Sequence, residues 1–563
     1  MRMPIDKDPA LGRKRQLPFG LAKIAGFGAI IFAATLGLGA CESCHPNGGG
    51  PKPPLKDDTP PTIRFYLVSD FAGALEPCGC VKDQLGGLDH MAAWLNAQKT
   101  RNDAPGDSFF VTSGPLFFLD PTLKEEKKAQ ELAKAQTLAA SLKSLDFVAF
   151  APGRNDWALG QETLVDLGTR SGGVTLAGNA KGAPQPWRGP ILREAHGVKV
   201  GFIGVAAPDK ATEGEPLGGL VCDPPVESVK ADVASLKAQG ASIVVLLAAV
   251  GRGEAKRLAD AVPDATAILV GSTGGGGEEN TETPPPELVG NVLVVETGNH
   301  LQTVAVLDLF VRNGSLEFQD GTGLSDAQKR ADLTRRIDDL RGKIADWEKS
   351  GKVSPQDLDA RKRDLDKLKR ELTDLDKKPA PTAGSYFRIA IQEVRDELGT
   401  DKTVHEQLLA YYKKVNDDNK LAFANKLPVP AAADAPFYAG IESCTKCHAA
   451  PRAVWYKTAH AGAYKTLQTG FKEFNLDCVS CHVTGYDRPG GSTVTHVEKL
   501  QDVQCEVCHG PSGKHAASPK TPPPVPRPST DVCLTCHHPP HVHTFDASTR
   551  VLEILGPGHG KPL

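Results

Sequence analysis

The chain has 563 residues, too many for one hydrophobic core, so we expect two or three domains with less compact segments between them. Its formal net charge is −3 at pH 7, and this near-neutral balance gives no indication of a nucleic-acid partner. Thirteen cysteines accompany only three methionines, and eight of these cysteines lie beyond Asp434. Cysteine chemistry is therefore concentrated in the last part of the chain.

The N-terminus places basic residues before an uncharged stretch of seventeen residues, 24–40. A membrane-spanning helix needs about 20 apolar residues, whereas this shorter length is typical of a secretory signal peptide. The stretch ends in Leu38-Gly39-Ala40-Cys41, which resembles the lipobox of bacterial lipoproteins. The resemblance implies a signal peptide over 1–40 and lipidation of Cys41. We therefore expect a lipid-anchored protein of the bacterial cell envelope, at the periplasmic side or the outer membrane.

Glycine and proline dominate the stretch that follows, so 41–61 is expected to be a flexible tether. From 62 to 322, apolar runs alternate with amphipathic stretches. Runs that are apolar at consecutive positions are typical of strands buried on both faces, which predicts a layered α/β domain. The expected strands are 62–69, 108–113, 147–151, 198–206, 242–249, 267–271, 291–297 and 303–311.

The pattern changes over 323–430, where apolar residues recur at spacings of four and three from Leu333 to Trp347. This heptad spacing predicts a helix, and a second helix is expected to begin at Pro355 after a polar break. We interpret the two as an antiparallel coiled-coil hairpin that acts as a spacer, with homodimerisation as the alternative. Further helix is expected over 386–398 and 404–419, followed by an alanine- and proline-containing linker.

The segment 431–563 carries four copies of a C-x-x-C-H pentad. Their residues are Cys444, Cys447 and His448; Cys478, Cys481 and His482; Cys505, Cys508 and His509; and Cys533, Cys536 and His537. The chain has only sixteen histidines, so a histidine after four successive cysteine pairs is not a coincidence. C-x-x-C-H is the attachment signal of c-type haem, in which both thiols form thioethers and the histidine binds the iron.

Two other uses of these cysteines are less consistent with the sequence. Zinc sites with four thiolate ligands would leave the four histidines without a role and would place free thiolates in an oxidising compartment. Redox disulfides would require a βαβ context that this segment lacks. We therefore predict four haem c groups, which also supply much of the core of a segment poor in regular apolar pattern.

The second iron ligands can be narrowed by elimination. Met1, Met3 and Met91 are the only methionines and lie far from the pentads, so each iron is expected to have two histidine ligands or an open site. The distal candidates are His460, His515, His496 and one of His541 and His543. A fifth pentad, at Cys41, Cys44 and His45, would exclude lipidation of Cys41, and we favour lipidation over a fifth haem.

Five stretches around the pentads resemble, in the same order, the tetrahaem cytochrome c-554/c-prime family. They are 438–448, 455–467, 478–491, 503–515 and 530–541. The resemblance implies closely spaced haems, mostly with two histidine ligands, that transfer several electrons to or from redox partners such as other cytochromes or quinone-linked complexes. The alternative is a multihaem redox enzyme that acts on a small substrate at an open iron or at the Cys78/Cys80 pair.

Segments of 62–322 resemble the calcineurin-like metallophosphoesterase domain of 5'-nucleotidases. The segments are 63–73, 85–95, 147–160, 197–209 and 291–309. That family holds two metal ions with aspartates and histidines. Here Asp70 is retained, but Ala72 replaces a histidine, Gly114-Pro115 replaces a G-D motif, and 153–156 departs from G-N-H-E. We therefore expect phosphoesterase activity to be lost.

The loop after the first strand carries Cys78 and Cys80, where the family would have its metal site. Two interpretations remain open: redox or metal chemistry at this pair, or a structural disulfide between one of these cysteines and Cys222.

Overall fold

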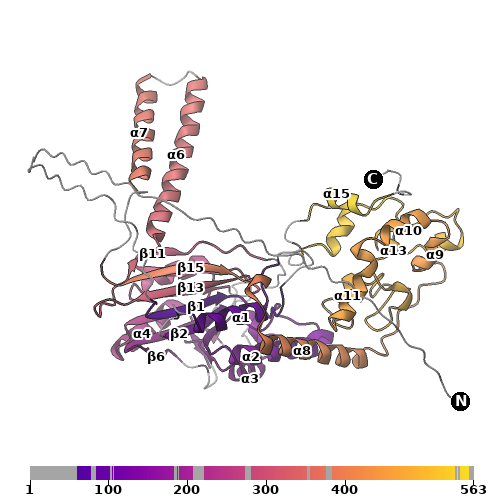
Figure 1. Ribbon diagram of the computed structural model, residues 1–563, viewed down its shortest axis with the longest axis horizontal. Helices are drawn as coiled ribbons and strands as arrows, with labels where there is room; N and C mark the ends of the chain where they lie inside the picture. Colours follow the sequence, from indigo (N-terminus) through magenta and orange to yellow (C-terminus); the bar gives the residue numbers. More distant parts are fainter. Residues whose placement is uncertain are drawn as a thin grey trace, which may run out of the picture. The chain divides into compact units, whose positions relative to one another are not determined.

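Two β-sheets face each other in the computed structural model, with helices on both outer sides (Figure 1). The structure describes residues 60–77, 84–101, 104, 107–182, 187, 189–206, 221–272, 280–350, 355–375, 383–538, 542, 545–556 and 559. The predicted signal peptide, the predicted tether up to residue 59, Cys41 and the fifth pentad lie outside these residues. Cys78, Cys80, His541 and His543 also lie outside them.

The first sheet has seven strands, and its centre is built from the parallel strands β1, β2 and β3. Across the sheet, the order is β14 (Gln319–Asp320), β15 (Tyr386–Glu393), β13 (Thr303–Phe310), β1 (Ile63–Ser69), β2 (Asp107–Gly114), β3 (Phe147–Pro152) and β4 (Val174–Thr175). The strands β13 and β1 are antiparallel. The carboxyl ends of β1, β2 and β3 consequently meet at one edge of the sheet.

The second sheet has six strands, with β7, β9, β10 and β12 parallel at its centre. Its order is β11 (Glu287–Val289), β12 (Val292–Val295), β10 (Ala267–Gly271), β9 (Ile243–Ala249), β7 (Val198–Ala206) and β6 (Ile191–Ala195). A separate pair joins β5 (Ala180–Lys181) to β8 (Val221–Cys222). All eight strands expected from apolar runs are confirmed.

Three apolar cores hold these layers together. Between the sheets, Phe65, Phe109 and Phe202 pack with their ring centres 5.3 to 6.2 Å apart. Burial of such a side chain contributes about 1.5–3 kcal/mol. The other two cores lie between a sheet and its helices. The first sheet is covered by α1 (Leu88–Lys99), α2 (Lys128–Lys143), α3 (Gln161–Ser171) and α8 (Lys402–Ala422), and the second by α4 (Pro225–Ala238) and α5 (Arg252–Ala261). The layered α/β fold class is confirmed.

The prediction of helix over 386–398 is wrong, because most of this stretch forms β15. This strand pairs with β13 along its whole length, from Thr303 opposite Glu393 to Phe310 opposite Tyr386. Phe387, Ile389 and Ile391 alternate along it and face the core between the sheets, which decides strand over helix. With β15 in the sheet and α8 packed beneath it, the α/β layers extend beyond 322, and only part of 323–430 is a separate arm.

The helical hairpin is an insertion between β14 and β15. It consists of α6 (Leu324–Ser350) and α7 (Pro355–Leu375), which run side by side in Figure 1. Their shared core is small and is formed by Leu333, Ile337, Ile344, Leu365 and Leu368. The second helix begins at Pro355, as predicted, because proline needs no backbone N–H partner in a first helical turn.

The C-terminal segment is made of short helices joined by turns. Among its described residues, the buried members of its apolar cluster are Tyr464, Leu467, Leu476, Val479, Val483, Val494 and Val497. Among the residues that the structure describes, no helix is long and apolar enough to cross a membrane.

Candidate functional site

Each pentad lies on a single helical turn. In the first and fourth pentads, the backbone N–H of His448 and His537 donates to the carbonyl of the first cysteine, at 2.9 and 2.8 Å. The second and third pentads form α12 (Val479–His482) and α13 (Cys505–His509). A helical turn brings residues four positions apart to one side of the backbone. Both thiols and the imidazole of a pentad can therefore serve one bound group.

Two of the pentad histidines face a second imidazole from a distant part of the segment. The ring centres of His448 and His515 are 6.1 Å apart, and those of His460 and His537 are 6.0 Å apart. Two imidazoles bound to opposite sides of one metal ion, each through a bond of about 2 Å, have their ring centres about 6 Å apart. These spacings fit an iron between the rings. The structure thus brings together two predicted distal ligands and two pentads, and their ligation of iron stays a prediction.

Hydrogen bonds fix the tautomer of three histidines in the segment. Nδ1 lies close to a backbone carbonyl oxygen in His482, His509 and His515, at 2.6, 2.9 and 2.6 Å. Since a carbonyl oxygen only accepts, each Nδ1 carries the proton and each Nε2 keeps a free lone pair. Metal-binding histidines are commonly oriented by such a bond from their other nitrogen. All three rings are therefore prepared to bind a metal through Nε2.

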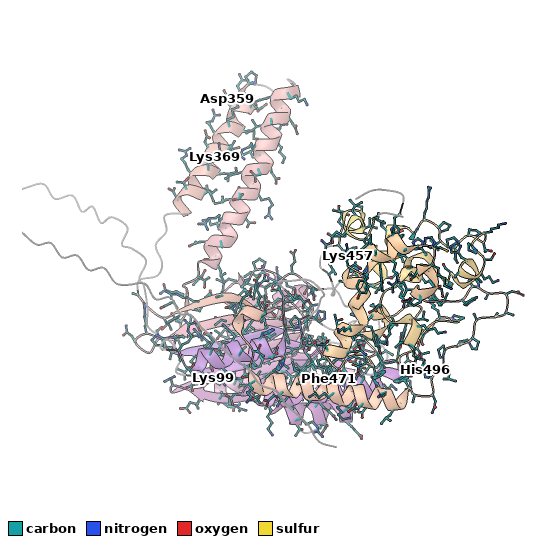
Figure 2. All side chains as sticks on the ribbon, turned by 45° about the vertical axis from the view of Figure 1, so that its right-hand side comes forward. Lys99, Asp359, Lys369, Lys457, Phe471 and His496 are labelled. Carbon is teal, nitrogen blue, oxygen red and sulfur yellow. The ribbon has the colours of Figure 1, made fainter. Side chains whose placement is uncertain are left out.

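His496, labelled in Figure 2, is held by two threonines in the same tautomer, with the proton on Nδ1. Its Nδ1 lies 3.1 Å from Thr495 Oγ1 and 3.4 Å from Thr493 Oγ1. Both hydroxyls donate to backbone carbonyls, those of Phe423 and Lys426, at 2.7 and 2.8 Å. The hydroxyls can therefore only accept from His496, so Nδ1 is the protonated nitrogen. This predicted distal candidate also has a free Nε2, and its loop packs against α12 through Val494 and Val497.

The His460 and His537 rings lie in partly apolar surroundings. Burial lowers the pKa of both, and for His537 the nearby His460 lowers it further. The His537 ring is stacked on Phe545, with ring centres 4.3 Å apart and planes 8° apart. A neutral imidazole is the form that binds a metal, so the surroundings favour that form at neutral pH.

His559 was not selected from the sequence, although it lies near two pentads. Burial lowers its pKa, and charges on His509 and His448 lower it further. Its proximity to these proximal histidines makes it a further candidate iron ligand. It stands in a glycine-rich terminus without a local motif, so only the fold could reveal it.

The thiols of different pentads lie close to one another. The Cys444 side chain interacts with Cys505 and lowers the pKa of Cys505 to about 7, and Cys481 and Cys536 interact in a similar way. None of the eight pentad cysteines forms a disulfide. The first pentad thus adjoins the third, and the second adjoins the fourth, which suits a closely spaced array of bound groups.

Two aspartates, Asp70 and Asp156, follow the carboxyl ends of β1 and β3, at the edge of the sheet where open α/β sheets usually bind ligands. There both carboxyl oxygens of Asp156 accept backbone N–H groups, from Leu116, Phe117 and Gly153 at 2.7–3.1 Å. Asp70 accepts the N–H of Ser272 at 2.9 and 3.1 Å. Burial raises the pKa of both aspartates to about 7. Both carboxyl groups therefore accept backbone N–H groups, and burial makes them easier to protonate than an exposed aspartate.

Gly114 allows this arrangement. A Cβ at this position would lie 1.7 Å from Asp70 Oδ1, and the backbone has a positive φ of 88°. Burial raises the pKa of the Cys222 thiol to about 11. Cys78 and Cys80 lie outside the described residues, so a disulfide between one of them and Cys222 stays a prediction. Within the described ranges, no three histidine, cysteine, aspartate or glutamate side chains converge as a metal site.

Comparison with known proteins identifies the C-terminal segment. The family described as "Cytochrome c554 and c-prime" matches residues 443–510. The curated protein cytochrome c-554 of Nitrosomonas europaea is 38% identical over 96 residues, a match that covers 14% of this chain and 40% of the relative. This chain therefore spans about two fifths of the length of that relative. The predicted resemblance of the segment to this family is confirmed, and c-type haem binding is a property that the family implies.

Solved structures resemble the chain more distantly. A 5'-nucleotidase precursor from Thermus thermophilus has a TM-score of 0.42 at 16% identity and covers 68% of this chain and 62% of its own. The calcineurin-like phosphoesterase YfkN from Bacillus subtilis has a TM-score of 0.36 at 18% identity, with 45% of this chain and 86% of its own covered.

Proposed function

We propose that this chain is a multihaem electron-transfer protein whose C-terminal cytochrome c554-type segment binds four haem c groups. The α/β layers act as its frame and have no phosphoesterase activity. The protein is exported and held at the cell envelope by lipid on Cys41, and it exchanges electrons with other cytochromes or quinone-linked complexes. The proposal on the envelope and on partners rests on the sequence, since Cys41 lies outside the described residues.

The observation that carries the proposal is the pairing of His448 with His515 and of His460 with His537 at about 6 Å. When bound, each haem supplies an iron that gains or loses one electron. The residues of the chain would fix its position: the two thiols of a pentad would form thioethers with it, and the pentad histidine would bind its iron. At the first and fourth pentads, His515 and His460 would be the second histidine on the iron. An iron with two histidine ligands has no site for substrate, which favours electron transfer over catalysis.

The bonding of Asp156 supports the loss of hydrolysis. Two-metal hydrolysis needs carboxylates and imidazoles that are free to bind metal ions. Here the oxygens of Asp156 accept three backbone N–H groups, and the family's histidine positions hold other residues. We expect no metal-dependent hydrolysis of p-nitrophenyl phosphate by the purified protein with Mn²⁺ or Mg²⁺. Hydrolysis above the level of an Asp156→Ala variant would contradict this part of the proposal.

Haem stoichiometry tests the main proposal. The full chain, produced in a host that matures c-type cytochromes, should contain four haems per chain by pyridine haemochrome assay. A colourless protein with zinc or disulfides at the pentads would refute the proposal, and five haems would place one at Cys41 and Cys44.

Carbon monoxide added to the reduced protein should leave the spectrum unchanged if all four irons have two ligands. A carbon monoxide complex would instead support the redox-enzyme alternative with an open iron.

A further inference from the structure

Helix α2 of the α/β layers contacts the C-terminal segment directly before the second pentad. The amide nitrogen of Gln130 donates to Asn475 and Asp477 side chains at 3.2 and 3.0 Å, and its oxygen accepts the backbone N–H of Leu476 at 3.0 Å. Gln130 and Asn475 are buried. Because both ends of the Gln130 amide are used across this contact, the residues leading into Cys478 are held in a defined position on α2.

Two lysines of α2 bring positive charge to this contact. Lys127 Nζ lies 2.6 Å from a carboxyl oxygen of Asp477, and Lys134 Nζ lies 3.0 Å from Glu131 and 3.7 Å from Asp477. The Lys134 and Glu131 side chains are only 17% and 6% exposed. Burial opposes the charge of Lys134, but the two carboxylates outweigh it and raise its pKa, so Lys134 is protonated at neutral pH.

These charges lie next to the second pentad. Asp477 directly precedes Cys478, and both Lys127 and Lys134 lie within 4 Å of its carboxylate. Both signs of charge are therefore close to the cysteine that would be bonded to a haem. In a partly buried contact, such charges are screened less than on an open surface.

The residues before the second pentad also contact the loop after β1 and helix α8. Lys472 pairs with Glu76, in the loop after β1, and its Nζ lies 4.3 Å from the ring centre of Tyr412 on α8. The neighbouring Phe471, labelled in Figure 2, has the Lys413 ammonium 4.8 Å from its ring centre. The α/β layers therefore contact the residues that lead into the second pentad through α2, α8 and the loop after β1.

We infer that Lys134 and Asp477 are positioning residues that set the reduction potential of the haem attached at Cys478 and Cys481. This inference rests on the proposed haem content. Reduction adds one electron to the iron, so a nearby positive charge stabilises the reduced form and a nearby negative charge destabilises it. Lys134 therefore raises this potential and Asp477 lowers it. The α/β layers then do more than support the C-terminal segment, because they give one of the four haems a reduction potential of its own.

The test is a spectroelectrochemical titration of the full-length haem protein. Lys134→Met should lower one of the four midpoint potentials, and Asp477→Asn should raise one, each by about 59 mV, which is a tenfold change in the equilibrium constant for one electron. Lys128→Met is the matched control, because Lys128 lies on the same helix, is 43% exposed and pairs only locally with Glu125. Its four potentials should equal those of the unchanged protein.

Potential shifts of opposite sign in Lys134→Met and Asp477→Asn would show that the charges act on the haem, because a structural disturbance does not follow the sign of the charge removed. Potentials that stay unchanged in both variants, or that move in the same direction, would overturn the inference. Haem content is measured on the same samples: fewer than four haems in the unchanged protein contradict the proposed function, whereas four haems with unshifted potentials contradict only the inference. If Lys134→Met does not fold, Asp477→Asn decides alone, since asparagine keeps the size of the side chain and can still accept from Lys127.

Discussion

The Glu506 side chain joins three parts of the C-terminal segment. This residue is only 2% exposed, and its carboxylate accepts backbone N–H groups from Ala439, Gly440 and Ser512 at 2.7–3.0 Å. Gly440 precedes the first pentad, and Ser512 follows the third. A buried carboxylate thus fixes the separation of two pentads in a region with few apolar contacts.

Glu506→Ala should destabilise the haem protein by about 1–3 kcal/mol, because several buried N–H groups lose their acceptor at once. Denaturant unfolding of the full chain, followed through the haem absorption, measures this change. Glu506→Gln keeps the size and one carbonyl acceptor, so its loss should be smaller. Equal stability of the alanine variant and the unchanged protein would show that these bonds do not hold the pentads together.

His515 provides the sharpest test of the paired rings. Replacing it with alanine removes the imidazole opposite His448 and leaves the iron of the first pentad with one open site. The reduced His515→Ala protein should bind one more carbon monoxide per chain than the unchanged protein, measured by titration of the difference spectrum. His405→Ala is the control, since His405 lies on α8 and pairs with Asp89 far from the pentads. If carbon monoxide binding does not change, His515 is not an iron ligand.

The elements of the α/β layers were predictable where burial left a clear pattern. Strands such as β9 and β10 are buried on both faces and therefore appear in the sequence as unbroken apolar runs. The strand β15 is less buried, and its apolar Phe387, Ile389 and Ile391 alternate with residues of the other face instead of forming an unbroken apolar run. Its place in the sheet depends on pairing with β13, which the sequence of 386–393 alone does not show.

The residues proposed to bind haem divide in the same way. The pentads are local, since five consecutive residues contain both cysteines and the histidine of the attachment signal, so the sequence identifies them directly. The distal candidates depend on the fold: His515 on α14 (Gly513–Ala517) lies close to a pentad far before it, and His460 lies close to one far after it. Sequence could propose these histidines but could not assign each to a pentad.

The hairpin of α6 and α7 should be dispensable for folding and haem binding. Its apolar contacts are mostly internal, and its ends lie close together, because Gln319 pairs with Tyr386 and its side chain donates to the Ala383 carbonyl at 3.1 Å. Replacing 324–382 with a short glycine–serine linker closes a small loop at little cost. Four haems per chain and a melting temperature within a few degrees of the unchanged protein are expected.

Light scattering on the same variant addresses the alternative role of the hairpin. If the unchanged protein is a dimer and the variant a monomer, the hairpin is a dimerisation element. Loss of haem on deletion would instead show that the hairpin supports the C-terminal segment.

At the scale of the whole molecule, most apolar burial lies in the α/β layers and little lies in the C-terminal segment. The α/β layers have three apolar cores that contain most of the buried side chains, whereas the C-terminal segment has one small cluster. Its other buried groups include polar ones, such as Gln504 and Glu506, that satisfy backbone N–H groups but add little apolar burial. Four haems with their large apolar faces would supply the missing core.

Protein made without haem attachment should therefore fold in its first part only. Limited proteolysis of the haem-free full chain should degrade the segment beyond about residue 430 and leave a resistant fragment that ends near the linker after α8, because the α/β layers keep their own cores. The haem-loaded chain, digested in parallel, should resist cleavage in both parts. Mass spectrometry of the fragments identifies the boundary. A haem-free segment as resistant as the loaded one would mean that hydrogen bonds such as those of Glu506, together with the contact on α2, are sufficient to fold it.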